Sequence, residues 1–429
     1  MDIKNLISRI FQEEGNKKLL ENFTSLSLLQ IANYVLPFII FLYVIRVLGP
    51  EKFGLISFAA AFISYFQIFT DYGFNYSATR EIAIYRDDKK KLSHFFSSIM
   101  IIKLFLGLLS LLVLGLVLLV FSTFRINSIL YLLTFGMVIG NILFPVWFFQ
   151  GIEKMKYITV LNVISKLIST IAIFIFVKDV SNYLYVPLLN SLGFIVAGVI
   201  GFLLVIKYFD VELIRPSTEM LIHELREGWH VFISTVSVSL YTNTRIFAVG
   251  LFTNNTITGY YTIAEKLMEV VQTFPLASLT QSLYPRLSKT YSQDPILAYK
   301  ITKKFQKYTI IFFLLLIPII FVLAPFIVDI VAGEHYEDTV LAFRILLIAV
   351  FFINANAFQI FYLLVSGKGE IYAKIHVVTG LLGCFITFLL VYSLNYIGAA
   401  ITIILVAIVV LILTNYYLKE EKDERSKVL

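Results

Sequence analysis

Charged residues are scarce in this chain of 429 residues, and so are cysteine and histidine. Only 15% of the residues are Asp, Glu, Lys or Arg, whereas 59% are hydrophobic, which is more apolar surface than a water-soluble core can bury. The single cysteine, Cys384, excludes an internal disulfide. The five histidines are scattered without a neighbouring ligand at zinc-site spacing, so we expect no metal site.

Motifs for ATP and ester hydrolysis are missing as well. The segment Ser366–Glu370 contains Gly-Lys-Gly but lacks the spacing and the Lys-Ser/Thr of a phosphate-binding loop. The Gly-x-Ser-x-Gly signature of a nucleophilic serine is absent. We therefore expect a protein that is not an enzyme and holds no cofactor, in which H+ or Na+ would be the coupling ion of any active process.

Long apolar stretches fill almost the whole chain. A helix that crosses a bilayer needs about 20 mostly apolar residues. The stretches of this kind lie at about 23–45, 55–79, 95–121, 128–150, 158–177, 183–206, 229–252, 257–283, 305–329, 339–365, 373–393 and 397–418. The sequence thus predicts an all-α polytopic membrane protein with twelve transmembrane helices, in which internal prolines such as Pro145 do not prevent helix formation.

The loop lysines and arginines predict the orientation. One set of loops and tails carries 26 of them, whereas the opposite set carries only Arg46, Lys52, Arg125 and Lys178. Because cytoplasmic loops are enriched in these residues, both termini should be cytoplasmic. Residues 1–21 are polar with helically spaced apolar positions, which predicts a surface helix rather than a signal peptide. The basic residues are spread over separate loops, so no nucleic-acid partner is expected.

The two halves of the chain resemble each other. The turn 47–59 and the turn 251–264 both have a glycine that opens the returning helix, Gly54 and Gly259, followed five residues on by an alanine. The longest cytoplasmic loop lies between the sixth and seventh spans. This order predicts a parallel repeat: an N-lobe at 22–207, a linker at 208–227, a C-lobe at 228–418 and a charged tail at 419–429.

Three segments carry a resemblance to a known family: Arg46–Gly54, Asp71–Glu81 and Trp147–Glu153. They resemble the bacterial polysaccharide-transporter branch of the MOP superfamily, which contains the Wzx-type flippases for O-antigen and capsule repeat units. The resemblance covers nearly the full length. It implies two pseudo-symmetric six-helix lobes around a central cavity, acting as a monomer, and movement of undecaprenyl-diphosphate-linked oligosaccharides from the inner to the outer leaflet.

Ionisable residues inside the expected spans are the candidate site, because each costs about 2.5–3.5 kcal/mol at bilayer depth. Arg344 lies about one turn from a boundary and is expected to snorkel. The others are Asp71, Lys103, Lys166, Arg245, Glu265, Lys266 and Glu269. As ligands of the substrate diphosphate we consider Arg245, Lys266, Lys103, Lys166 and Arg80, and as coupling groups Glu265, Glu269 and Asp71. Snorkelling is an equal alternative for Lys103 and Lys166.

The helical hairpin at 229–283 holds four of these charges. Its turn at 251–256 places Arg245 and Glu265 at similar depth, and Lys266 lies three residues from Glu269. The seventh span is also rich in Ser and Thr, as expected for the wall of a wet cavity. Two interpretations stay open here, a buried salt-bridge network and a diphosphate site. For Asp71 we favour a structural partnership with Arg80 or Lys103 over a proton-sensitive role.

Two rival functions remain at this stage. One is an ion-coupled drug or metabolite antiporter of the same superfamily. The other is a membrane glycan polymerase or glycosyltransferase, against which the outer loops of at most about ten residues argue. Cytoplasmic loops could also dock other polysaccharide-assembly proteins.

Overall fold

The computed structural model of the protein describes the backbone of residues 14–428. Side chains are described for residues 36–418, apart from 238, 241, 277–282 and 284–286. Throughout this described part the regular structure is helical, with no β-strand. Most of the expected surface helix at 1–21 lies outside the described residues, as do the side chains of the tail at 419–429.

The first half of the chain contains a long bent helix followed by shorter ones. The elements are α2 (Glu14–Asp71), α3 (Phe74–Tyr85), α4 (Lys89–Val120), α5 (Ser122–Arg125), α6 (Ser128–Leu143), α7 (Val146–Gly151), α8 (Met155–Phe176), the 3-10 helix η1 (Val180–Leu184) and α9 (Tyr185–Tyr208).

The second half consists of long helices joined by short turns. They are α10 (Thr218–Phe252), α11 (Asn255–Gln293), α12 (Pro295–Ala332), α13 (Glu337–Val365) and α14 (Gly369–Val428). Side-chain caps fix several starts: the side chains of Ser217, Asn254 and Asp294 accept hydrogen bonds from backbone N–H groups in the first turns of α10, α11 and α12.

Four backbone breaks shape these helices. Gly49 (φ 69°) lets α2 reverse direction before Pro50, and Asn395 (φ 52°) does the same inside α14. Tyr72 and Gly73, both with positive φ, separate α2 from α3. Pro145 has no N–H to donate and ends α6 at Leu143, so the expected span at 128–150 consists of two helices, α6 and α7, which together form one stretch long and apolar enough to cross a membrane.

The protein is a multi-pass helical membrane protein by the length and composition of its helices. Eight helical stretches are long and apolar enough to cross a membrane, and two of these, 36–85 and 369–418, contain the reversals at Gly49 and Asn395. The polar helices α10 and α11 are not among the eight. Each of the twelve expected segments coincides with helical backbone, while the number that cross the bilayer stays a prediction.

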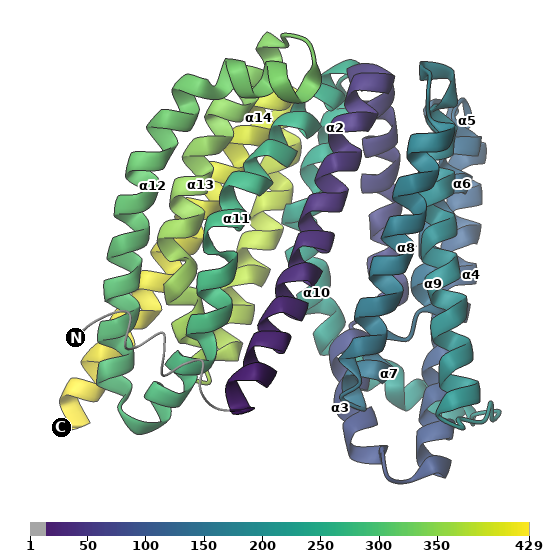
Figure 1. Ribbon diagram of the computed structural model, residues 1–429, viewed down its shortest axis with the longest axis vertical. Coiled ribbons are helices and arrows are strands. Elements are labelled where there is room, and N and C mark those ends of the chain that lie inside the picture. The colour runs from purple at the N-terminus through teal and green to yellow at the C-terminus, as the bar shows by residue number, and fades with distance from the viewer. Residues whose placement is uncertain (1–13, 429) are drawn as a thin grey trace.

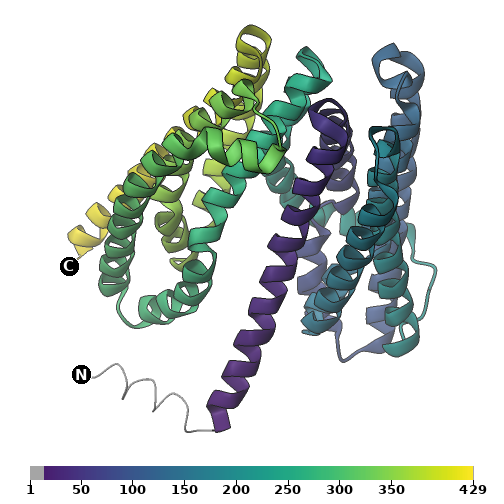
Figure 2. The same ribbon diagram turned by 45° about the horizontal axis from the view of Figure 1, so that its top comes forward.

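The helices stand roughly side by side in two groups (Figure 1). Helices α3 to α9 lie on one side and α11 to α14 on the other, as a second view confirms (Figure 2). Helix α2 stands between them and, because it packs against α4, α6 and α8, is counted with the first group. Helix α10 packs against both α2 and α14, and α11 packs against α2. We call the end where α2 begins and α14 finishes the lower end, and the end with the Gly49 turn the upper end (Figure 1).

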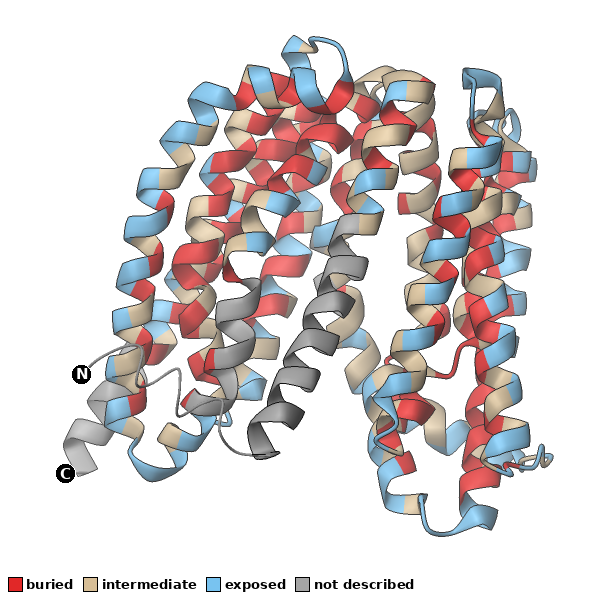
Figure 3. Cartoon of the chain, viewed as in Figure 1, coloured by how far each residue is buried: buried red, intermediate tan, exposed pale blue. Residues whose placement is uncertain are grey.

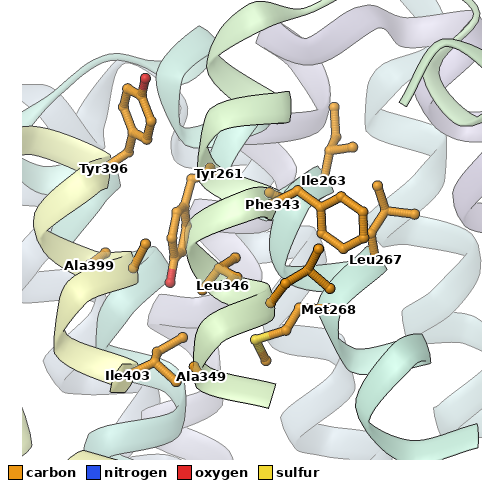
Figure 4. Close-up of a cluster of buried hydrophobic side chains, with 14 of the residues drawn as sticks. Tyr261, Ile263, Leu267, Met268, Phe343, Leu346, Ala349, Tyr396, Ala399 and Ile403 are labelled. Atoms are coloured by element: carbon orange, nitrogen blue, oxygen red, sulfur yellow. The ribbon is translucent and has the colours of Figure 1, made fainter. Parts of the chain in front are cut away.

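The second helix group has a buried interior and an exposed outer side. In the second group, buried residues lie on the facing sides of α11, α13 and α14, whereas α12 exposes most of its outer side (Figure 3). The core there interleaves Tyr261 and Leu267 of α11 with Phe343 and Leu346 of α13 and with Ala399 of α14 (Figure 4). The outward-facing leucines and phenylalanines of α12 are what a lipid-facing surface requires.

The connection between the halves is held against the first of them. The backbone N–H of Glu212 donates to Ser93 Oγ at 3.1 Å, and that of Ile214 donates to Ser97 Oγ at 2.9 Å. Both serines are on α4. Residues 209–214 therefore run along α4 before the chain enters α10.

Candidate functional site

Asp71 and Lys103 form an ion pair within the first group of helices. Lys103 Nζ lies 3.1 Å from Asp71 Oδ1, and it also lies 3.5 Å from Asn141 Oδ1 on α6. The side chain of Lys103 is 1% exposed and that of Asp71 is 19% exposed. The Nδ2 of Asn75 donates to Asp71 Oδ2. A buried cation that is already neutralised in this way does not snorkel, and in this conformation it is not accessible to a diphosphate.

Arg245 and Glu265 form the second buried pair. The turn between α10 and α11 brings them to the same depth, where Arg245 Nη2 lies 2.5 Å from Glu265 Oε1. Their side chains are 10% and 12% exposed, and the buried Tyr261 is one turn from Glu265 on α11. This pair fastens the two helices of the hairpin together. Removing one member would leave a buried charge, which is strongly destabilising.

Lys266 and Glu269 form a third pair, and this pair is open. Lys266 Nζ lies 2.8 Å from Glu269 Oε2, with side-chain exposures of 49% and 60%. Val270 and Phe274, which follow on the same face of α11, are also exposed. Of the three pairs, this is the one whose cation can exchange its partner for an incoming anion without unpacking a core.

Two further candidate cations lie elsewhere. Arg80 is on α3 near the lower end, has a side chain 74% exposed and pairs with its neighbour Glu81. Lys166 is half-buried on α8, a helix that packs against α9 and α2. The structure therefore does not gather the five candidate cations into one cluster. It partners Asp71 with Lys103 rather than with Arg80.

The polar seventh span is satisfied largely by its own backbone. The hydroxyls of Ser234, Thr235 and Ser237 donate to carbonyls one turn back in α10, at 3.1, 2.9 and 2.7 Å. Thr244 instead bonds Tyr65 of α2 across the helix interface at 2.9 Å. Part of the polarity that suggested a wet wall is thus internal to the helix or used in helix packing.

The contact between the two groups of helices at the upper end is a feature that sequence reasoning missed. A Cβ atom built on Gly54 would lie 1.9 Å from the Asn255 carbonyl oxygen, and one on Gly259 would lie 2.0 Å from the Pro50 carbonyl oxygen. The two contacts mirror each other, since the same number of residues separates Pro50 from Asn255 and Gly54 from Gly259. The sequence repeat identified both glycines but not that they touch.

Other side chains extend this contact. Arg46 of α2 donates from Nε to the Val331 carbonyl of α12 at 3.3 Å and from Nη2 to the Ile330 carbonyl. Lower down, Phe58 stacks on Phe247 of α10 at a ring separation of 5.5 Å. The upper ends of the two groups are therefore tightly joined.

A carboxylate cluster lies at the other end of α10. Glu224 is half-buried and close to Glu81 of α3 and to Glu227, with His223 as a cationic neighbour when protonated. Burial, with a smaller contribution from the neighbouring carboxylates, raises the pKa of Glu224 from 4.5 to about 7. Glu224 lies outside the expected span at 229–252.

This raised pKa predicts a pH-dependent stability. Because the folded-state pKa exceeds the unfolded one, the contribution is fully present below about pH 4.5 and is lost as the pH rises through about 7. The purified protein in detergent should therefore have a lower Tm at pH 8 than at pH 6, and Glu224→Gln should reduce that difference. Glu219→Gln, at an exposed position of the same helix, is the control. An unchanged pH difference in Glu224→Gln would contradict the assignment.

Comparison with known proteins identifies the family. Residues 19–291, more than half of the chain, match the family described as "Polysaccharide biosynthesis protein". The chain belongs to this family. Its resemblance to the polysaccharide-transporter branch is thereby confirmed.

Two curated relatives cover nearly the whole chain. One, named "Putative O-antigen transporter", is from Escherichia coli strain K12 and is 29% identical over 402 residues, which is 94% of this chain and 97% of the relative. The other has the same name, is from Shigella dysenteriae and is 28% identical over 399 residues, which is 91% of this chain and 98% of the relative.

Solved structures of the MOP superfamily share the fold. The lipid II flippase MurJ in an inward closed conformation matches with a TM-score of 0.72 at 14% identity, covering 91% of this chain and 87% of MurJ. A multidrug resistance MATE family transporter in an inward-facing conformation matches with a TM-score of 0.71 at 16% identity, covering 92% and 96%. These likenesses establish a MOP-type helical fold.

Proposed function

We propose that this protein is a flippase for undecaprenyl-diphosphate-linked oligosaccharide repeat units. It moves them from the inner to the outer leaflet of the bacterial cytoplasmic membrane by alternating access, for O-antigen, capsule or exopolysaccharide synthesis, and it has no enzymatic activity. The observation that carries this proposal is the near full-length similarity to two proteins named as O-antigen transporters. Membership of a polysaccharide biosynthesis family and the MOP-type fold support it.

The proposed architecture has twelve spans in two six-helix lobes, 22–207 and 228–418, around a central cavity. The lower end faces the cytoplasm, with both termini there, because the lysine-rich loops belong to that end. The joined upper end then closes the route to the outside. Alternating access requires that this contact open while the lower ends approach each other.

The proposed substrate contact is Lys266. A diphosphate needs positive charge in a partly desolvated place, and Lys266 offers an ammonium held by an exposed carboxylate that the diphosphate can replace. Glu269, released from Lys266, would then be free to take up a coupling H+ or Na+. Arg245, Glu265, Lys103 and Asp71 would hold the helices in register around this point.

The test is Lys266→Ala in a strain that depends on the protein for surface polysaccharide. At matched expression, surface polysaccharide should fall roughly tenfold, as expected when a charge-assisted contact to the substrate is lost. Lys266→Arg should retain most of it. Lys178→Ala, which removes an exposed lysine from the turn after α8, is the matched control and should have no effect. Normal surface polysaccharide in Lys266→Ala would remove this residue from the mechanism.

Two measurements distinguish the rival functions: the phenotype of a strain that lacks the protein, and an assay of the purified protein. The fold is also shared by a multidrug transporter. If this protein had that function, the strain lacking it would be sensitive to drugs and would keep its surface polysaccharide. A polymerase or glycosyltransferase predicts turnover of sugar substrates by the purified protein in detergent, where there are no two leaflets to connect. The flippase predicts loss of surface polysaccharide with neither of these.

A further inference from the structure

A groove opens between α11 and α12 in the lower half of the second helix group. It is lined by Pro275, Leu276, Phe305, Tyr308, Thr309 and Phe312 and encloses about 280 Å3. Its walls are almost entirely apolar. On α12 the lining residues recur at i, i+3, i+4 and i+7, so they form one face of that helix.

The groove has a buried floor, to which Leu276 and Thr309 contribute, and an outer rim that is open to the lipid. Tyr308 is 54% exposed, Phe312 is 45% exposed, and Phe274 beside Pro275 is 72% exposed. Helix α12 is the outer helix of its group, with exposed residues along most of its length (Figure 3). A flexible hydrocarbon chain in the bilayer can therefore enter the groove sideways, without passing through the bundle.

Four lysines lie at the lower end of the same helix. Lys300, Lys303, Lys304 and Lys307 fall within eight residues, and the sequence contains no Asp or Glu between Asp294 and Asp329. Among the described side chains, none of the four is in an ion pair with a carboxylate. Lys304 Nζ lies 5.9 Å from the Tyr308 ring centre, and Lys304, Tyr308 and Phe312 form one i, i+4, i+8 row. Lys304 therefore adjoins the apolar groove, and Lys307 lies one turn further along α12 beside it.

We propose that this surface is the docking site for the polyprenyl-diphosphate anchor of the lipid-linked substrate. The isoprenoid chain lies in the α11–α12 groove, and the diphosphate binds the ammonium groups of Lys304 and Lys307. This proposal rests on the proposed function and names the part of the substrate that this face recognises. Phosphodiester headgroups carry one negative charge, so a cluster of four lysines matches a diphosphate better than it matches a single bulk phospholipid.

The position of the groove suggests how the anchor reaches the transport route. Phe274, Val270, Glu269 and Lys266 follow one another upward on the exposed face of α11, starting beside the groove. Lys266, paired with Glu269, is the first cation that a diphosphate moving upward along this face would meet. The tail can remain in lipid throughout, which avoids the cost of moving it through a polar passage.

The experiment is photo-crosslinking in proteoliposomes of phosphatidylethanolamine and phosphatidylglycerol. A photoreactive phenylalanine analogue is placed at Phe312, and the probe is undecaprenyl diphosphate. The matched control position is Leu314, which is 59% exposed at the same depth and lies on the face of Lys300 and Lys307 instead of the face that lines the groove, so it separates binding in the groove from attraction to the lysines alone. We expect a specific adduct at 312 and not at 314. The double variant Lys304→Gln/Lys307→Gln should lower the adduct about tenfold, and the Lys→Arg pair should retain it.

Competition distinguishes the sources of the lipid phosphate. Unlabelled undecaprenyl diphosphate should abolish the adduct, whereas an equal excess of phosphatidylglycerol should not. Equal adducts at 312 and 314, or equal displacement by phosphatidylglycerol, would overturn the proposal in favour of ordinary boundary lipid. If the wild-type protein restores surface polysaccharide while the crosslinking fails in this way, the proposed docking site is wrong and the proposed flippase function is unaffected. If it does not restore polysaccharide, the proposed function itself fails.

Discussion

Gly54→Ala and Gly259→Ala are each expected to abolish most export of surface polysaccharide. A Cβ at either position would lie about 2 Å from a backbone carbonyl of the other helix group, 1.9 Å at Gly54 and 2.0 Å at Gly259. Backbone atoms cannot rotate away as a flexible side chain can, so the upper ends of α2 and α11 must separate. Overpacking of about 1–3 kcal/mol shifts a two-state balance by roughly 5- to 150-fold, here away from the joined upper end.

The measurement is surface polysaccharide at matched expression, together with the reactivity of a cysteine at Ser57 towards a membrane-impermeant thiol reagent in a Cys384→Ala background. We expect export to fall and labelling to rise in both glycine variants. Gly115→Ala is the matched control, because a Cβ on this helical glycine would meet no atom within 4 Å. Wild-type export in either Gly54→Ala or Gly259→Ala would show that the contact need not close during transport.

The second large effect is expected at Lys103. Lys103→Met leaves the Asp71 carboxylate without its ammonium partner, 3.1 Å away in the native pair. Breaking a buried pair by removing one member typically costs about 3–5 kcal/mol, so the Tm of the purified protein in detergent should drop sharply. The amount of folded protein in the membrane should drop with it.

The double variant Asp71→Asn/Lys103→Met separates structure from coupling. Removing both charges avoids the stranded carboxylate, so most of the lost stability should return. We expect export to return with it, because both groups are already satisfied by each other and by Asn75 and Asn141. A double variant that is stable but inactive would instead assign Asp71 a direct part in ion coupling.

Depth in the membrane was the property most accessible from the sequence. Counting from the turn at 251–256 placed Arg245 level with Glu265, and the structure pairs them. The partnership of Asp71 with Lys103 was one of two structural options, since both Lys103 and Arg80 are within reach of the same end of the second span. Hydropathy defines how deep a residue lies along a helix, and the pairing of Arg245 with Glu265 and of Asp71 with Lys103 follows mainly from equal depth.

Rotation about the helix axis was much less accessible. Helix α4 is apolar all round, so periodicity does not say which of its sides meets another helix, and the burial of Lys103 could not be deduced. In α11 polar and apolar residues are mixed around the helix, so the exposure of Lys266 could not be deduced either. The reciprocal contact of Gly54 with Gly259 depends on how two separate helices meet, which no local pattern encodes. Pro145 shows a local limit: the sequence places a proline inside the span but does not show that α6 ends at Leu143, nor that the Asn141 carbonyl, which loses its helical donor at Pro145, lies 3.4 Å from Lys103 Nζ of α4.

The hydrogen bonds that the backbone N–H groups of Glu212 and Ile214 donate to Ser93 and Ser97 have a mechanical consequence. They attach residues 209–214 to α4 of the first half. Only residues 215–217 then link this segment to α10, which begins at Thr218. Three extended residues span about 10 Å. In a transporter whose halves tilt against each other, this short linker places the pivot at the N-terminal end of α10. It also sets an upper limit on how far that end of α10 can move relative to α4.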